Sequence, residues 1–219
     1  MALQLLCRKL GMTQLYAEDG ECIPVTVLHV EPNPVVQKKS VEKDGYTALQ
    51  LGVGSRRAVR TNKALAGHFK KANVAPTRRL LECRVSPEVA GQYEVGSTIG
   101  AELFEQGQRV DLIGTSKGRG TSGVVRRHHF SIKRQTHGTH EYFRHGGAIG
   151  TRSFPGHVIK GIGMAGRLGN ARTTALNREV VRIDGDKGLI FIRGGVPGHR
   201  DGIVRIRATV KGKKKTSAN

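Results

Sequence analysis

Residues 115–173 contain most of the side chains in this chain whose type and spacing could serve a chemical function. These 59 consecutive residues hold eleven Lys or Arg, six His, twelve Gly and a single acidic residue, Glu141. A long run of one sign of charge favours a polyanion as partner, because binding releases the polyanion's condensed counterions. The segment therefore predicts a surface that binds nucleic acid.

The cationic side chains are spread along the whole segment, as expected for contacts with successive phosphates of a folded RNA. A solvated protein surface would normally mix both signs of charge. The residues predicted to contact RNA are Lys117, Arg119, Arg126, Arg127, Lys133, Arg134, Arg144, His145, Arg152, Lys160, Arg167 and Arg172.

The histidines of the segment admit a second chemistry, which is metal binding. His137 and His140 have the spacing of a ligand pair, but no Cys and only one carboxylate stand nearby, so a closed site would consist almost entirely of histidine. Stacking on bases or hydrogen bonding to phosphate and ribose is favoured instead. We predict no metal site and no cofactor, and any structural Mg²⁺ would belong to the RNA.

Two glycine runs, residues 118–123 and 161–166, match the G-x-G-x-x-G dinucleotide fingerprint. Neither lies in a strand–helix–strand unit, and neither ends in the Gly-Lys-Ser/Thr of a phosphate-binding loop. Glycine also lets a backbone turn sharply and approach a phosphate closely, although an ordinary disordered linker would be equally glycine-rich. The glycines predicted to approach RNA closely are Gly118, Gly120, Gly123, Gly147, Gly150 and Gly156.

Four aromatic residues, Phe130, Tyr142, Phe143 and Phe154, are interleaved with the basic ones. They could stack on unpaired bases or form a small anchoring cluster, and the sequence leaves both roles open. No Ser or Cys has a recognisable nucleophile context, and the Asp residues lie mostly in or beside turns, so we predict that the protein is not an enzyme.

The rest of the chain must fold into the body that carries this segment. Its apolar residues alternate in short runs separated by Gly, Pro and Asp-Gly turns, which predicts a mainly β fold resembling a small barrel or sandwich. One short helix is expected over residues 62–73. The expected strands are residues 12–16, 22–30, 35–37, 46–51, 80–85, 98–103, 109–113, 179–184, 189–193 and 202–207.

The positive charge is concentrated in the segment that lacks apolar periodicity. The chain of 219 residues has a net charge of +20, and residues 115–173 supply half of it. Their large apolar residues follow neither a helical nor a strand period, so a partner must order them. We therefore predict a body formed by residues 1–114 and 174–210, an irregular extension of residues 115–173 and a flexible basic tail of residues 211–219.

Three cysteines, Cys7, Cys22 and Cys83, give neither a disulfide framework nor zinc-ligand spacing, which indicates reduced thiols in a cytosolic protein. The first residues do not resemble a secretory signal, and no apolar stretch is long enough to span a membrane. We expect a soluble intracellular protein without a membrane or small-molecule partner; the bacterial type is favoured, and a processed organelle protein is the alternative.

Residues 104–127 resemble the signature of the universal L three family of large-subunit ribosomal proteins, with its aromatic, acidic, Ser, Gly and Arg positions in place. Further colinear matches include residues 8–14, 23–27, 67–69, 75–78, 164–166 and 196–198. The resemblance implies a barrel of the kind found in translation factors, with a long finger that enters the large ribosomal RNA.

The same resemblance implies a cytoplasmic ribosomal constituent that binds near the 3′ end of this RNA and nucleates assembly of the large subunit. It places the finger tip, around residues 145–155, close to the peptidyl transferase centre. It also suggests large-subunit ribosomal proteins fourteen and nineteen as neighbours.

The tip departs from the family pattern at two places. Thr151 stands where many bacterial members carry a glutamine that can be methylated, so no modification is expected there. Residues 144–147 read Arg-His-Gly-Gly, whereas the family often has Arg-Arg-Pro-Gly. Two rival classes are a DNA-binding protein, whose best groove-reading helix would be residues 62–73, and an RNA-acting enzyme that uses His137 or His140.

Overall fold

The computed structural model describes residues 3–209, and the chain divides into two compact units. Residues 1–115 and 172–219 form the first unit, called the body, and residues 116–171 form the second, called the basic extension. The sequence prediction placed these boundaries after residues 114 and 173. The predicted basic tail, residues 211–219, lies outside the described residues.

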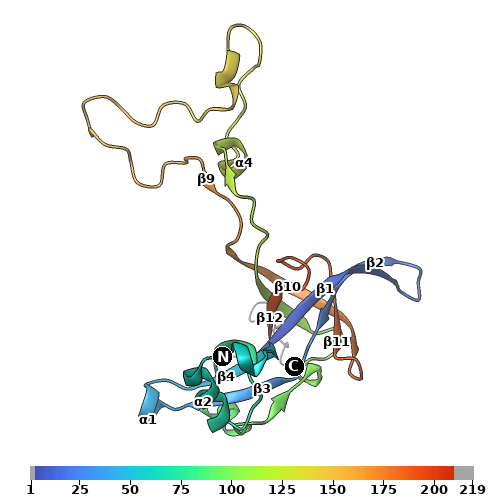
Figure 1. Cartoon of the computed structure of the whole chain (residues 1–219). Helices are drawn as coiled ribbons and strands as arrows, with labels where there is room; N and C mark the ends of the chain where they lie inside the picture. Colours follow the sequence, from blue (N-terminus) through green and yellow to red (C-terminus); the bar gives the residue numbers. More distant parts are fainter. Residues whose placement is uncertain (1–2, 210–219) are drawn as a thin grey trace, which may run out of the picture. The chain divides into compact units, whose positions relative to one another are not determined.

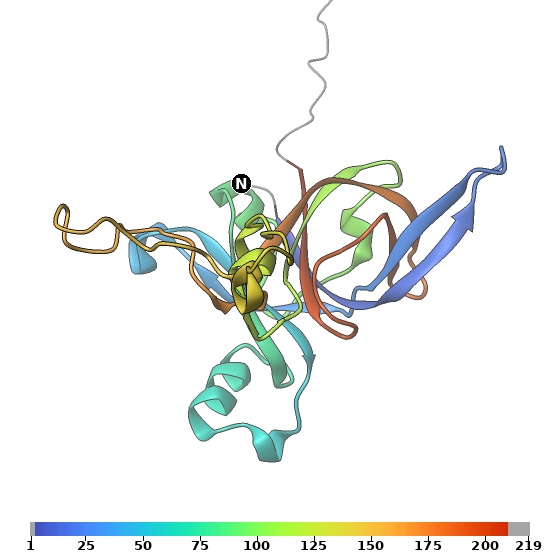
Figure 2. The same cartoon turned by 90° about the horizontal axis from the view of Figure 1, so that it is seen from above.

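Six antiparallel strands of the body close into a barrel, which Figures 1 and 2 show from two directions. In order around the barrel they are β1 (Gln4–Tyr16), β12 (Ile203–Ala208), β7 (Arg109–Thr115), β10 (Arg172–Asp184), β11 (Leu189–Arg193) and β2 (Cys22–His29). The predicted mainly β fold is therefore confirmed.

Alternate side chains of these strands fill the barrel interior, as the strand period of two requires. The fully buried residues that face one another across the strand pairs are Leu5, Cys7, Leu28, Val110, Leu112, Val180, Ile190, Ile192, Val204 and Ile206. Burial also raises the pKa of the Cys7 thiol, so this group remains a neutral and unreactive part of the core.

A second sheet of the body has the strand order β5 (Thr77–Arg84), β4 (Ala48–Ser55), β3 (Asn33–Lys39) and β6 (Thr98–Ile99). Its core is continuous with that of the barrel. Asn33 ties the two sheets together, because its fully buried side-chain amide donates to the carbonyls of Leu6 and Glu31, and its Oδ1 accepts from the Leu6 amide.

Helix α2 (Lys63–Lys71) packs beside this second sheet. Phe69 lies in a small cluster with Val36 and Ala72, and the Asn62 side chain caps the helix by accepting from the Leu65 amide at 2.9 Å. The other helical segments of the body are one or two turns long: α1 (Val41–Asp44), α3 (Pro87–Gly91) and the 3-10 helices Ala58–Arg60 and Ala101–Leu103.

Several elements differ from their sequence prediction, among them β10, which begins at Arg172 rather than at Glu179. Strand β1 begins at Gln4 rather than near Met12, because its first half pairs with β12, and local pattern does not reveal a partner so distant in sequence. Helix α1 occupies the predicted turn at Asp44-Gly45, and Gly45 ends it with φ of 78°. The predicted strand 98–103 is only Thr98–Ile99, followed by a 3-10 helix.

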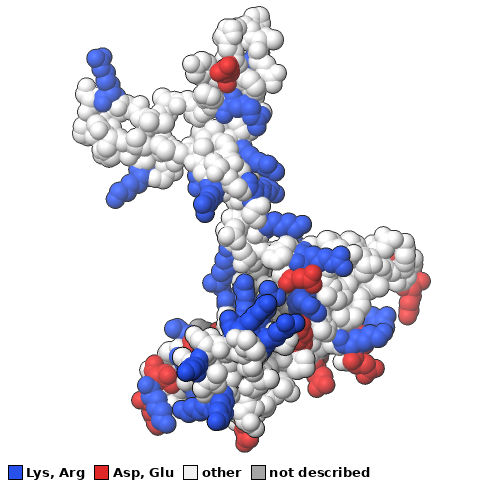
Figure 3. All heavy atoms as spheres, in the orientation of Figure 1, with Lys and Arg blue, Asp and Glu red and all other residues white. Residues whose placement is uncertain are grey.

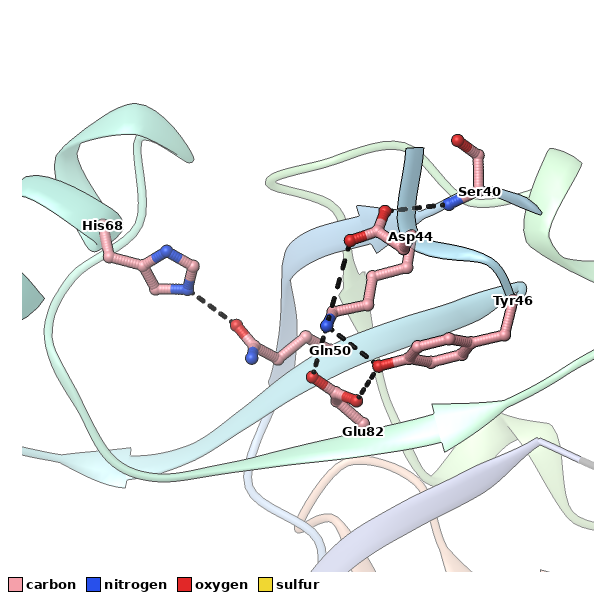
Figure 4. Close-up of polar contacts among 7 residues, drawn as sticks. Ser40, Asp44, Tyr46, Gln50, His68 and Glu82 are labelled. Atoms are coloured by element: carbon pink, nitrogen blue, oxygen red, sulfur yellow. Dashed lines mark hydrogen bonds and ion pairs between the residues drawn. The ribbon is translucent and has the colours of Figure 1, made fainter. Parts of the chain in front are cut away.

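A polar network holds β3, α1 and β5 together at one edge of the second sheet (Figure 4). The Tyr46 hydroxyl donates to Glu82 Oε2 at 2.7 Å and accepts from Lys39 Nζ at 2.9 Å. Lys39 Nζ also lies 3.1 Å from Glu82 Oε1, and Arg84 covers the Tyr46 ring with its guanidinium 5.0 Å from the ring centroid. On the same sheet His68 of α2 lies 2.7 Å from the side chain of Gln50.

This network predicts a pH-dependent contribution of Glu82 to stability. The hydrogen bond from Tyr46 and the Lys39 ammonium lower the pKa of Glu82 below its ordinary value of 4.5. A carboxyl with a lowered folded-state pKa stabilises the fold above its unfolded pKa, and the contribution is lost as pH falls through the folded pKa. We expect Glu82→Gln to lower the melting temperature at pH 7 and to have a progressively smaller effect as the pH falls below 4.5 towards 3. Thermal denaturation across this range checks it, with Glu18→Gln as a surface control; a pH-independent difference would contradict it.

Candidate nucleic-acid interface

The basic extension leaves the body after β7 and returns at β10, two strands that pair directly. Thr115 lies opposite Arg172, and Ile113 lies opposite Thr174. Because cross-strand partners in an antiparallel ladder have Cα atoms about 4.5–5.5 Å apart, the two ends of the extension are held together.

A buried carboxylate fixes this strand pair. Asp111 of β7 is 2% exposed, and its Oδ1 accepts from the Asn177 amide and the Thr209 hydroxyl, each at 3.0 Å. Its Oδ2 accepts from Arg207 Nη2 at 3.1 Å. Asn177 has φ of 54° and lies in the bulge where the register of β10 shifts, so Asp111 stabilises a strained turn of the chain.

The two chain segments of the extension continue to pair beyond the body. Ser116 donates its amide to the Ala171 carbonyl, Arg119 donates to Leu168 at 2.8 Å, and Leu168 donates to Gly120 at 3.0 Å. Strands β8 (Thr121–Ser122) and β9 (Gly166–Arg167) then add a short antiparallel ladder. We call this paired region, residues 116–122 and 166–171, the root of the extension.

A small packed hub follows the root. Helix α4 (Val124–His128) buries Val124, and Phe130 packs beside it against Gly146 and Gly163. Arg127 Nη1 donates to the Met164 carbonyl at 2.6 Å, and His128 Nε2 lies 3.0 Å from the same oxygen. Val124 and Ser122 are the buried side chains of the described extension, so a residue outside the hub gains little from burial.

The predicted basic residues of residues 116–171 are exposed, apart from the half-buried Arg127. Figure 3 shows Lys and Arg distributed over this unit with very little acidic surface. Within the described chain, no carboxylate forms an ion pair with these cations. Arg127 differs because it stabilises the hub, and Arg172 differs because it belongs to β10 of the body.

The predicted glycines fall into two groups. A Cβ at Gly120, Gly123 or Gly147 would meet no protein atom within 4 Å, which leaves the space beside their Cα atoms open to a partner. Gly118, Gly150 and Gly156 have protein atoms at ordinary contact distances. In the second glycine run, Gly163 and Gly166 pack against Phe130 and Arg127, so internal packing explains these two positions.

The aromatic residues also divide between the two roles left open by the sequence. Phe130 is an anchor of the hub. Phe154 is 89% exposed and Tyr142 is 64% exposed, with the Tyr142 ring edge-on to His145 at 5.1 Å between centroids. Exposed rings of this kind are available for stacking on bases.

The predicted tip, residues 145–155, is irregular and follows a 3-10 helix, His140–Arg144. Thr151 donates its hydroxyl to the Phe154 carbonyl at 2.5 Å, before a cis peptide bond between Phe154 and Pro155.

Among residues 3–209, no group of three or more His, Cys, Asp or Glu side chains could hold a metal ion. Within the same residues, no helix is long and apolar enough to cross a membrane.

Gly169 is a site that the sequence predictions missed, and its substitution should open the root. It has φ of 73°, and an added Cβ would collide with the Lys117 carbonyl oxygen. We expect Gly169→Ala to lower the exchange protection of the Arg119 and Leu168 amides at least about tenfold, since a left-handed non-glycine residue alone costs about 1–2 kcal/mol. Hydrogen exchange measures this, with Gly123→Ala in open space as control. Equal protection in both variants would contradict the role of Gly169.

A closed β-barrel with an exposed and strongly basic extension is typical of proteins that bind structured nucleic acid. Comparison with known proteins specifies the class further. The sequence profile of the family "Ribosomal protein L3" matches residues 88–188.

Curated relatives extend this match over nearly the whole chain. The large ribosomal subunit protein uL3 of Acidithiobacillus ferrooxidans is 48% identical over 212 residues, which cover 97% of this chain and 100% of the relative. The proteins of the same name from Kocuria rhizophila and Saccharophagus degradans are 46% and 48% identical, over 95% and 96% of this chain and 94% and 98% of their own lengths. The chain therefore belongs to the uL3 family of large-subunit ribosomal proteins, which confirms the resemblance found in the sequence.

Proposed function

We propose that the protein is a structural constituent of the large ribosomal subunit whose basic extension binds large-subunit rRNA. Within this role, the protein binds near the 3′ end of the RNA and nucleates subunit assembly. The tip of the extension reaches toward the peptidyl transferase centre. The protein acts in the cytoplasm, without catalytic activity and without a cofactor of its own, and structural Mg²⁺ belongs to the RNA.

One observation carries this proposal: the extension presents exposed cations on a backbone that has only a small hub of its own. The ten Lys and Arg of residues 116–171 are accompanied by one acid, Glu141. Phosphate contacts by these side chains would position the protein, and RNA shape would supply specificity. The uL3 relatives support a location in the ribosome, because their name assigns them to the large ribosomal subunit.

The open glycines and exposed rings have separate parts in this interface. Gly120, Gly123 and Gly147 allow the backbone to approach phosphate or sugar, and Tyr142 and Phe154 stack on unpaired bases. The protein neighbours that fit the proposal are large-subunit ribosomal proteins fourteen and nineteen. Their contacts lie on the body, where both signs of charge occur and ion pairs such as Arg193–Glu21 are present.

Binding measured across a salt series tests the proposal. The full chain is titrated with a fragment from the 3′ region of large-subunit rRNA and with duplex DNA of equal length. Tighter binding to the RNA at every salt concentration is expected, because the extension recognises folded RNA rather than charge alone. Equal affinity for both would mean that the interaction is generic, and it would favour the DNA-binding alternative.

A further inference from the structure

A small cavity on the outer wall of the barrel is lined by three arginines. Its volume is about 200 Å³, and it lies between the barrel and strand β5 of the second sheet. Arg79 comes from β5, Arg172 from β10 and Arg205 from β12, and no acidic residue lines the cavity. All of its residues belong to the body.

The strand register explains why these arginines converge. Arg172 lies opposite Thr115, and Arg205 lies opposite Ile113 on the same strand, β7. Because Thr115 and Ile113 are two residues apart, they and their cross-strand partners share one face of the sheet. This is the outer face, since the intervening Leu112 and Ile206 are fully buried within the barrel.

The charges of this cavity have no compensation within the described part of the chain. Several other arginines of the barrel form ion pairs, such as Arg207 with Asp111 and Arg193 with Glu21, whereas among residues 3–209 no carboxylate lies within ion-pair distance of the three cavity arginines. Burial lowers the pKa of Arg205, and repulsion from the neighbouring Arg172 charge lowers it further. An anion in the cavity would relieve this repulsion.

We infer that this cavity binds a phosphodiester group of the RNA backbone. Guanidinium groups bind phosphate through paired hydrogen bonds, and the apolar floor formed by Leu6, Leu81 and Ile113 strengthens that attraction by excluding water. The chain enters the basic extension directly after Thr115 and returns at Arg172, so RNA that follows the extension to its root reaches this cavity. The inference rests on the proposed RNA-binding function and adds a specific contact on the body.

The test uses two variants of the full chain. One combines Arg79→Gln with Arg205→Gln. The other carries Arg79→Gln alone, because Arg79 is exposed and tolerates substitution. The control is Arg56→Gln with Arg60→Gln, which removes two exposed charges from the same unit. We expect the cavity variants to lower affinity for the rRNA fragment about tenfold and to reduce the salt slope by about one. The control should have a smaller effect. Equal affinities and slopes for the cavity and control variants would overturn the inference.

Inorganic phosphate provides a second readout that does not need RNA. It should shift the Nε–Hε NMR signals of Arg79, Arg172 and Arg205 in the wild-type protein, and not those of Arg56 and Arg60. Inorganic phosphate could shift these signals while the cavity variants leave the salt slope of RNA binding unchanged. That result would overturn RNA as the occupant of the cavity. If the wild-type protein failed to bind the rRNA fragment, the proposed function would fail, and the phosphate titration would still decide whether the cavity holds an anion.

Discussion

Deleting the basic extension is expected to lower the affinity for large-subunit rRNA by a factor on the order of 10³ near physiological salt, and to flatten the salt dependence by about five units or more. This magnitude follows if about six to ten cations contact phosphates, because each contact contributes about 0.7–0.9 to the slope. Residues 116–171 supply ten Lys and Arg. The measurement is binding to the rRNA fragment across a salt series.

The pairing of β7 with β10 allows the extension to be deleted without breaking the barrel. Thr115 and Arg172 are cross-strand partners, so an Asn-Gly turn in place of residues 116–171 should close β7 and β10 as a two-residue hairpin. Circular dichroism and melting temperature check that the body still folds. A second variant keeps the extension and replaces its ten Lys and Arg by Gln. Wild-type affinity in either folded variant would contradict RNA binding by the extension.

Removing the buried carboxylate of Asp111 is expected to produce a large loss of stability of the body. Asp111→Ala leaves Arg207, the Asn177 amide and the Thr209 hydroxyl without their shared partner. Breaking one side of a buried ion pair costs about 3–5 kcal/mol, and we expect the lower end of this range because the unpaired Arg207 side chain is 31% exposed. Urea denaturation of the full chain measures the free energy of unfolding.

Two further variants separate the ion pair from a general effect of charge removal. Asp186→Ala removes an exposed carboxylate from a turn and should change stability by less than about 0.5 kcal/mol. Asp111→Ala combined with Arg207→Leu should recover part of the loss, since no unpaired cation remains. A loss below about 1 kcal/mol for Asp111→Ala alone would show that this carboxylate does not fix the strand pair.

For the body, the sequence predicted the positions of the strands and the helix better than the pairing of the strands. Alternation of apolar residues located most strands, and the helix expected over residues 62–73 is α2, Lys63–Lys71. Local pattern could not reveal that β1 begins at Gln4 or that β3, β4, β5 and β6 form a separate sheet, because both depend on contacts between distant residues. Strand pairing is a property of the whole chain.

In the extension, composition predicted the chemistry but not the internal packing. The excess of cations and the absence of an apolar period were visible in the sequence, and they predict that a polyanion orders the segment. The hub was not visible, because Val124, Phe130 and Gly163 meet only after the chain has turned back on itself. Arg127 was therefore grouped with the RNA-contacting residues, although it donates a hydrogen bond within the extension.

The most direct test of the account is hydroxyl-radical probing of rRNA from the tip of the extension. Cys22 is the exposed native thiol and is replaced by Ser, while Cys7 and Cys83 are buried, so a cysteine introduced by Ile149→Cys can carry a tethered iron chelate. A second probe at Val41→Cys, on the body, is the control. In reconstituted large subunits, the account predicts cleavage of rRNA around the peptidyl transferase centre from position 149 and elsewhere from position 41. Absence of rRNA cleavage from position 149 in subunits that contain the protein would contradict it.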